Sequence, residues 1–410
     1  MDPIRRRALI AAGIAASITL AIGLTAVAIT SGDGGDTDAR LPSGAATSNP
    51  ASSPEPKKAV TPDAYLAWVP GGLPPGFTAG ASKLHAFDRV TAVLQDNVWM
   101  TRSADSTGKV VDSPAPYFIP IDAAGIEPAR FGSFLPRPYR AAVAGLGPHQ
   151  GILSETSATL RRIGVGGSLT FHGGTVKIVA VLPDVLVGAQ ELVVDTPTAR
   201  AIGVRHARYL LMSPKPGSSP NDDQLRAQLL PLLPASMQYP VVQVRAPGET
   251  TYLHSADLVL PQENIKQRFG EWSGRPGDGG FLEIDPAWVN KNIVTTSVPI
   301  LGRVTCNRRL IAPIKAAMRQ LQNQGHASVV HDYEGCYVAK FLLNDPTSSI
   351  SRHAWGAAID INAAGSPYGA VPAQSRELIK AMERQGFIWG GRFIIPDGHH
   401  FEYLQPAGQT

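Results

Sequence analysis

Residues 351–362 read SRHAWGAAIDIN, and residues 386–403 read GFIWGGRFIIPDGHHFEY. These two stretches contain His353, Asp360 and His400. Two histidines and a carboxylate are enough to hold a catalytic zinc ion while a water molecule takes the fourth position. The residues around Asp360 have the composition of a strand, which predicts a metal site carried on a sheet.

The ordered motifs SxHxxGxAxD, GFxWGG and DxxHFE resemble the D-alanyl-D-alanine carboxypeptidase family of the VanY type. Members of this family are zinc peptidases that cut the stem peptides of bacterial peptidoglycan. The resemblance extends over about residues 262–404. It implies an α+β domain whose central antiparallel sheet carries the metal, with the same kind of metal ligands as hedgehog-like zinc domains. It implies that His353, Asp360 and His400 bind Zn²⁺ and that Asp397 is the general base and acid. A carboxylate in that role takes a proton from water whose pKa the zinc has lowered to about 7.

Other residues of the two stretches are expected to support the site. Ser351 and Glu402 would orient the ligands. His399 would line the pocket or contact substrate, because neighbours on an extended segment point to opposite faces and His400 faces the metal. Trp355 and Trp389 would pack in the core or the cleft wall, with stacking on substrate as the alternative.

The sequence departs from the family pattern at one position. Related enzymes often carry an arginine after a GCYV-like segment, where it stabilises the oxyanion, but here GCYVA (335–339) leads to Lys340. Lysine keeps the positive charge but lacks the planar guanidinium group, which can donate hydrogen bonds to two oxygen atoms at once. Lys340 is therefore either a catalytic cation, for whose weaker grip Arg352 could compensate, or an ordinary surface side chain.

Cys306 and Cys336 are the two cysteines of the chain. Both fall in the peptidase-like region, on either side of a helix expected from about Pro313 to Gln324. Disulfides persist in exported proteins, so we expect these residues to form one. A bridge that closes a loop of this length contributes about 3 kcal/mol to stability.

The N-terminus predicts a membrane anchor. Residues 8–30 carry no charge and are long enough to span a hydrocarbon core of about 30 Å. Three arginines in residues 1–7 favour a cytoplasmic N-terminus, with the rest of the chain beyond the span in an outer, extracytoplasmic location. The alternative is a cleaved signal peptide, with Ala-Val-Ala at 26–28 before the cut. Residues 31–62 are rich in Pro, Ser and Gly and predict a disordered linker.

Residues 63–260 predict a second α+β domain, made of short strands broken by Gly and Pro, such as the strand pair within 168–184. The helix, strand and strand in 153–184 resemble the extracytoplasmic core of MacB-type transporter permeases. The resemblance implies a role in binding, spacing or regulation, with a membrane protein complex as a partner. The histidines of this region are scattered and indicate no catalytic cluster: His85, His149, His172 and His206.

The composition excludes several classes of protein. With 410 residues, 43% apolar and 17% charged, the chain predicts two or three globular domains rather than a fibrous or wholly disordered protein. Its net charge of +4 includes the N-terminal arginines, and no basic stripe with interleaved aromatics indicates nucleic-acid binding.

The sequence thus predicts a single-pass cell-membrane protein whose residues 261–410 form a zinc-dependent D-alanyl-D-alanine carboxypeptidase acting on peptidoglycan stem peptides. Three alternatives stay open. The domain could be an endopeptidase of the same family, or a non-catalytic wall-binding or sensing module associated with a transporter or division complex. It could also be a hedgehog-like zinc domain without a wall substrate.

Overall fold

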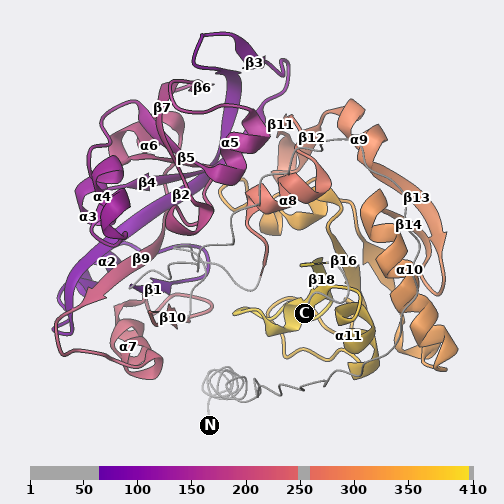
Figure 1. The fold of residues 1–410 in the computed structure, drawn as a ribbon. Helices are drawn as coiled ribbons and strands as arrows, with labels where there is room; N and C mark the ends of the chain where they lie inside the picture. The colour runs from indigo at the N-terminus through magenta and orange to yellow at the C-terminus, as the bar shows by residue number, and fades with distance from the viewer. Residues whose placement is uncertain (1–63, 248–258, 406–410) are drawn as a thin grey trace, which may run out of the picture. The chain divides into compact units, whose positions relative to one another are not determined.

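The computed structural model describes residues 64–247 and 259–405. The predicted anchor, signal-peptide alternative and linker therefore lie outside the described residues. Within the described ranges, no helix has both the length and the apolar character needed to cross a membrane. The described residues fall into one compact unit, which contains several sheets and short helices, so the mixed α+β class is confirmed (Figure 1).

Residues 64–247 are built on one large sheet and are called the sheet module. The long strand β2 (Phe87–Ala104) pairs with β9 and β4 along its length and with β3 and β6 near its end. Because β2 contacts both β4 and β6, the strands β2-β4-β8-β5-β7-β6 form a closed ring. The strands other than β2 are β1 (Tyr65–Trp68), β3 (Val110–Asp112), β4 (Ile119–Ile126), β5 (Gln150–Ser154), β6 (Ser168–Phe171), β7 (Gly174–Leu182), β8 (Leu192–Asp195), β9 (Ala207–Pro214) and β10 (Gln243–Arg245).

Alternating apolar residues fill this ring. One core cluster draws members from all six of its strands, including the fully buried Met100, Ile121 and Ile178. The predicted strand pair within 168–184 is confirmed as the antiparallel β6 and β7. Short helices cover the connections: α2 (Phe77–Ala81), α3 (Pro128–Gly132), α4 (Arg137–Ala144), α5 (Glu155–Arg161), α6 (Thr196–Ile202) and α7 (Asp222–Leu229).

Residues 259–405 carry the second main core, which is apolar and continuous from α8 to β18. Its central sheet is antiparallel with the order β15-β16-β18-β17, in agreement with the predicted sheet. The elements are α8 (Gln262–Phe269), β11 (Gly274–Pro276), β12 (Leu282–Ile284), α9 (Pro286–Asn292), β13 (Ile293–Val298), β14 (Gly302–Asn307), α10 (Arg308–Asn323), β15 (Tyr333–Gly335), β16 (Ala358–Ile361), α11 (Arg376–Glu383), β17 (Phe387–Trp389) and β18 (His400–Tyr403).

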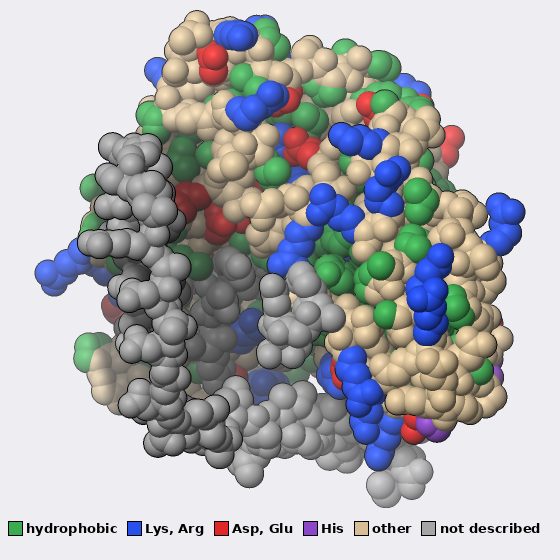
Figure 2. Space-filling model, turned by 45° about the vertical axis from the view of Figure 1, so that its right-hand side comes forward, with side chains coloured by type: hydrophobic (Ala, Val, Ile, Leu, Met, Phe, Trp, Pro, Cys, Tyr) green, Lys and Arg blue, Asp and Glu red, His purple; other side chains and the backbone are tan. Residues whose placement is uncertain are grey.

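Helix α10 begins earlier than the sequence predicts. The expected start is Pro313, but the helix starts at Arg308 because the Asn307 side chain accepts a hydrogen bond from the Arg309 amide and caps it. Pro313 lies inside the helix, where it gives up one hydrogen bond. The helix lies beside the β13–β14 hairpin (Figure 1). On the face of the molecule drawn in Figure 2, Lys and Arg side chains are spaced among neutral ones.

A buried ion network joins the sheet module to α8. Arg161 and Lys266 each bind Glu191, at 3.0 and 2.8 Å, and both also contact Glu271. Although burial opposes ionisation, Arg161 and Lys266 lower the pKa of Glu271 to about 2. The side chains of Arg161, Glu191 and Lys266 are fully buried, so the two parts of the chain share a polar core here.

Candidate metal centre

The three predicted ligands come from a short 3-10 turn and two neighbouring strands. His353 lies in the turn Arg352–Trp355, which begins where the Ser351 hydroxyl accepts a hydrogen bond from the His353 amide. Asp360 in β16 is directly opposite His400 in β18, so their side chains share one face of the sheet.

Gly356 makes this arrangement sterically feasible. It has φ = 60°, in the left-handed region, and it turns the chain from His353 into β16. A Cβ atom at this position would stand 2.6 Å from the Asn307 backbone nitrogen. A side chain here would therefore push the ligand turn away from the core.

The three side chains converge on one point. His353 Nε2 lies 3.2 Å from Asp360 Oδ2 and 3.2 Å from His400 Nδ1, and His400 Nδ1 lies 3.0 Å from Asp360 Oδ1. One ligand atom of each residue falls within 4.8 Å of the other two. The cluster is thus compact enough for a single metal ion.

The remaining polar atoms of the histidines have partners that leave the converging nitrogens free to act as ligands. His353 Nδ1 lies 2.8 Å from the Cys336 carbonyl oxygen, an acceptor that requires Nδ1 to carry the hydrogen. His400 Nε2 lies 3.6 Å from Glu402 Oε2. Glu402 in turn accepts a hydrogen bond from Arg352 Nε at 3.1 Å. These partners orient both rings toward Asp360.

The electrostatics of the cluster favour positive charge. Burial disfavours a charged His400, but hydrogen bonds to Asp360 and Glu402 outweigh it and raise the pKa of His400 to about 10. Burial likewise opposes ionisation of Asp360, yet the two histidines hold its pKa well below its usual range. The carboxylates of Asp360 and Glu402 therefore favour a positive charge beside the two imidazoles. A divalent cation could supply that charge in place of the proton on His400, so the donor set fits zinc.

Asp397 and His399 lie in the turn that leads into β18. The Asp397 amide donates to the Gly390 carbonyl at 2.9 Å, and the His400 amide donates to the Asp397 carbonyl at 3.2 Å. His399 Nδ1 lies 3.2 Å from Asp397 Oδ1 and 3.0 Å from the Ser366 carbonyl oxygen. The structure thus places His399 outside the three-residue cluster and beside Asp397.

The two candidate cations near the site differ in their surroundings. The Lys340 main chain runs beside the ligand turn, since its carbonyl accepts from the Ser351 amide at 3.1 Å. Arg352 is held by Glu402 and by the Leu260 carbonyl, which accepts from Nη2 at 2.6 Å. Arg352 therefore helps to orient Glu402, and its role at the oxyanion stays a prediction.

The two tryptophans near the site differ in burial and in their contacts. Trp355 is fully buried and packs on Trp272 with ring centroids 5.1 Å apart, so it has no surface for substrate. Trp389 is partly buried, and its Nε1–H donates to the Gly398 carbonyl at 2.8 Å. Trp355 is therefore a core residue, and Trp389 supports the turn that carries Asp397.

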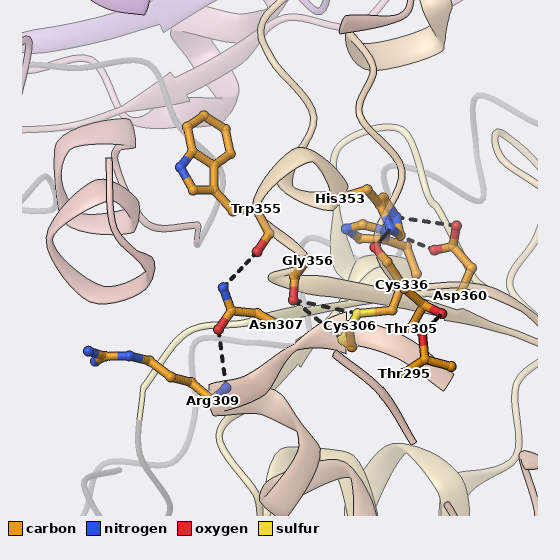
Figure 3. The surroundings of a disulfide bond; sticks show 11 residues. Thr295, Thr305, Cys306, Asn307, Arg309, Cys336, His353, Trp355, Gly356 and Asp360 are labelled. Atoms are coloured by element: carbon orange, nitrogen blue, oxygen red, sulfur yellow. Dashed lines mark hydrogen bonds and ion pairs between the residues drawn. A yellow bond between two sulfur atoms is a disulfide. The ribbon is translucent and has the colours of Figure 1, made fainter. Parts of the chain in front are cut away.

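The predicted disulfide between Cys306 and Cys336 is confirmed (Figure 3). It joins β14 to the segment after β15, and both sulfur atoms lie near the Gly356 carbonyl oxygen, at 3.4 and 3.5 Å. Because the Cys336 carbonyl also accepts from His353, the bridge supports a group that orients a ligand.

Sequence reasoning missed Asn362 and Gln374, which tie the site segments together. Asn362 Nδ2 donates to the Gln374 side chain at 2.7 Å, and Gln374 Nε2 donates to the carbonyls of Ile361 and Gly398 at 2.9 and 3.2 Å. Asn362 has φ = 62°, a conformation that asparagine tolerates better than most residues. An asparagine directly after the ligand strand was the available signal.

The antiparallel sheet thus carries a His-Asp-His cluster that could hold a metal ion. Residues 344–403 match the family model described as D-alanyl-D-alanine carboxypeptidase, which is the family that the motifs of this region resemble. The match contains all three clustered residues and Asp397, but it is shorter than the region of resemblance read from the sequence and excludes Lys340 and both cysteines. No curated protein matches the chain.

Solved structures similar to the chain include the permease domains that the sequence suggested. The periplasmic region of MacB from Actinobacillus actinomycetemcomitans is 12% identical, with 45% of this chain and 88% of that chain covered and a TM-score of 0.30. The extracellular domain of the ABC-type transporter YknZ from Gram-positive bacteria is 13% identical (44% and 98% covered, TM-score 0.27). A domain of a Porphyromonas gingivalis protein described as a permease is 15% identical (47% and 92% covered, TM-score 0.27).

Proposed function

We propose that the chain is a zinc peptidase that removes the terminal D-alanine from peptidoglycan stem peptides. The observation that carries the proposal is the convergence of His353, Asp360 and His400 within a domain that matches this family. Their donor atoms are those of a catalytic zinc site with an open fourth position.

In this proposal each polar residue of the site has one task. Zinc bound by the three ligands would supply Lewis acidity to the attacking water and the substrate carbonyl. Asp397 accepts the proton of the water and passes it to the amine of the leaving D-alanine. Glu402 and the Cys336 carbonyl hold the two imidazoles in place. Lys340 balances negative charge on the carbonyl oxygen as it develops.

The test is mass spectrometry of muropeptides incubated with the purified full-length protein. Pentapeptide muropeptides should lose one terminal D-alanine, and Asp397→Asn should abolish the loss while zinc binding persists. Asp278→Asn, which changes an exposed aspartate of the same region, is the matched control and should retain activity. Release of larger fragments would identify an endopeptidase instead. Zinc binding without any cleavage would favour a wall-binding or sensing module.

We further propose that residues 8–30 anchor the protein in the cell membrane with the peptidase on the outer face, as the apolar stretch and the preceding arginines predict. Protease treatment of intact protoplasts should digest the peptidase region and spare a membrane-bound N-terminal fragment. A membrane protein complex as partner of residues 63–260 is a proposal that cross-linking of the full chain in membranes would test. Recovery of the protein cross-linked only to itself would contradict it.

A further inference from the structure

The segment just before Asp397 is anchored on both sides by contacts that reach the sheet module. Ile394 packs against the core cluster of the sheet module that contains Leu66, Trp68 and Tyr209. Two residues later, the Pro396 carbonyl accepts a hydrogen bond from the Gly369 amide at 2.7 Å. The position of Asp397 therefore depends on the groups that hold Ile394 and Gly369.

Gly369 is held from the sheet module by Tyr239. The Tyr239 ring meets that of Tyr368 edge to face, with centroids 6.4 Å apart and an interplanar angle of 82°. A Cβ atom on Gly369 would overlap the Tyr239 hydroxyl, so Tyr239 packs directly against the loop backbone. Gly369 also has φ = 77°, which glycine adopts without strain.

The same loop contacts the candidate metal centre at its other end. The Ser366 carbonyl oxygen lies 3.0 Å from His399 Nδ1, and the Ser366 hydroxyl leaves no room for a Cβ atom on Gly398. The loop between β16 and α11 thus lies between Tyr239 on one side and residues 396–399 on the other.

We infer that Tyr239 is a positioning residue for Asp397, acting through Gly369 and Pro396, so that the sheet module completes the peptidase site. The inference rests on the proposed function. Asp397 Oδ1 is buried, and although it lies 3.2 Å from His399 Nδ1, no well-aligned hydrogen bond from the described part of the chain fixes it. Its main-chain anchors therefore set its place, and a general base must be held to within about 0.5 Å.

The first test compares Tyr239→Ala with Tyr239→Phe in full-length protein, using D-alanine release. Tyr239→Ala should lower kcat by roughly tenfold to a hundredfold, since a displacement of about 1 Å in a catalytic group has effects of this size. KM and zinc stoichiometry should stay within twofold of the wild-type values. Tyr239→Phe loses the hydroxyl but keeps the ring atoms that also lie against Gly369, so it should keep kcat. Val165→Ala, which alters an exposed side chain of the same module, should keep kcat as well. Unchanged kcat in Tyr239→Ala would overturn the inference. A rise in kcat would also overturn it, because the contact would then be autoinhibitory.

The second test does not need activity. Amide hydrogen exchange of residues 391–399 should be faster in Tyr239→Ala than in wild type, Tyr239→Phe or Val165→Ala, while exchange in α10 stays the same. Unchanged exchange in 391–399 would overturn the inference. If wild-type protein releases no D-alanine but exchange changes as expected, the positioning contact stands and the proposed reaction fails.

Discussion

Glu263 in α8 should make the protein less stable as the pH rises, which is the opposite of the usual effect of a carboxylate. Its side chain is fully buried, its Oε2 accepts a hydrogen bond from the Ser154 hydroxyl, and its Oε1 has no hydrogen-bond partner among the described residues. Burial, with the nearby negative charge of Asp184, raises the pKa of Glu263 from 4.5 to about 8. The folded protein therefore keeps this proton at pH values where the unfolded chain has lost it.

The sign and size of the effect come from proton linkage. Between pH 4.5 and 8 the folded state binds more protons than the unfolded state at this group, so the free energy of unfolding falls as the pH rises. Since each pH unit corresponds to about 1.4 kcal/mol, the loss across this interval is about 5 kcal/mol at most. Glu263→Gln keeps the shape of the side chain and cannot ionise, so it escapes this loss.

Urea unfolding of wild type and Glu263→Gln at pH 5, 7 and 9 measures the effect. The variant should gain stability relative to wild type as the pH rises, by about 3 to 5 kcal/mol between pH 5 and 9. Burial also raises the pKa of Asp122 to about 7. Asp122 contributes to the pH dependence of both proteins, so it does not alter the sign of the difference between them. Glu283→Gln, at an exposed glutamate, is the control. Parallel pH curves for wild type and Glu263→Gln would refute the reasoning.

Three further predictions concern the ion network, the ligand support and the disulfide. Arg161→Met should lower the free energy of unfolding by about 3 to 5 kcal/mol, because it leaves the buried Glu191 and the partly buried Glu271 with one cation; a loss below about 1 kcal/mol in urea unfolding would contradict this. Glu402→Gln should weaken zinc affinity about tenfold to a hundredfold in chelator competition, and unchanged affinity would show that it does not orient His400. Replacing Cys306 and Cys336 by alanine should cost about 3 kcal/mol, since the bridge spans 30 residues; an unchanged denaturation midpoint would contradict it.

The candidate metal centre was largely predictable because its residues occur in short, ordered motifs. His353 and Asp360 are seven residues apart, and Asp397 and His400 three, so local spacing already pairs them. The structure adds the register that brings β16 and β18 side by side. It also pairs Arg352 with Glu402, which the sequence could not do because the two residues are 50 positions apart.

The sheet module was much less predictable. Alternation revealed the β6–β7 hairpin, whose strands are joined by a two-residue turn. The closed ring depends on β2 pairing with β4 and β6 at once, a non-local choice that no window of sequence encodes. The buried ion network was missed for a related reason. Charged residues such as Arg161 and Lys266 are usually exposed, and their partners lie 5 to 110 residues away in the sequence.

The most direct test of the central claim is zinc titration of metal-depleted full-length protein, followed by D-alanine release from pentapeptide muropeptides. The account predicts no release without metal, full release at one zinc ion per chain, and no recovery in His400→Ala at the same zinc concentration. Equal release before and after zinc addition, or release by His400→Ala at the wild-type rate, would contradict it.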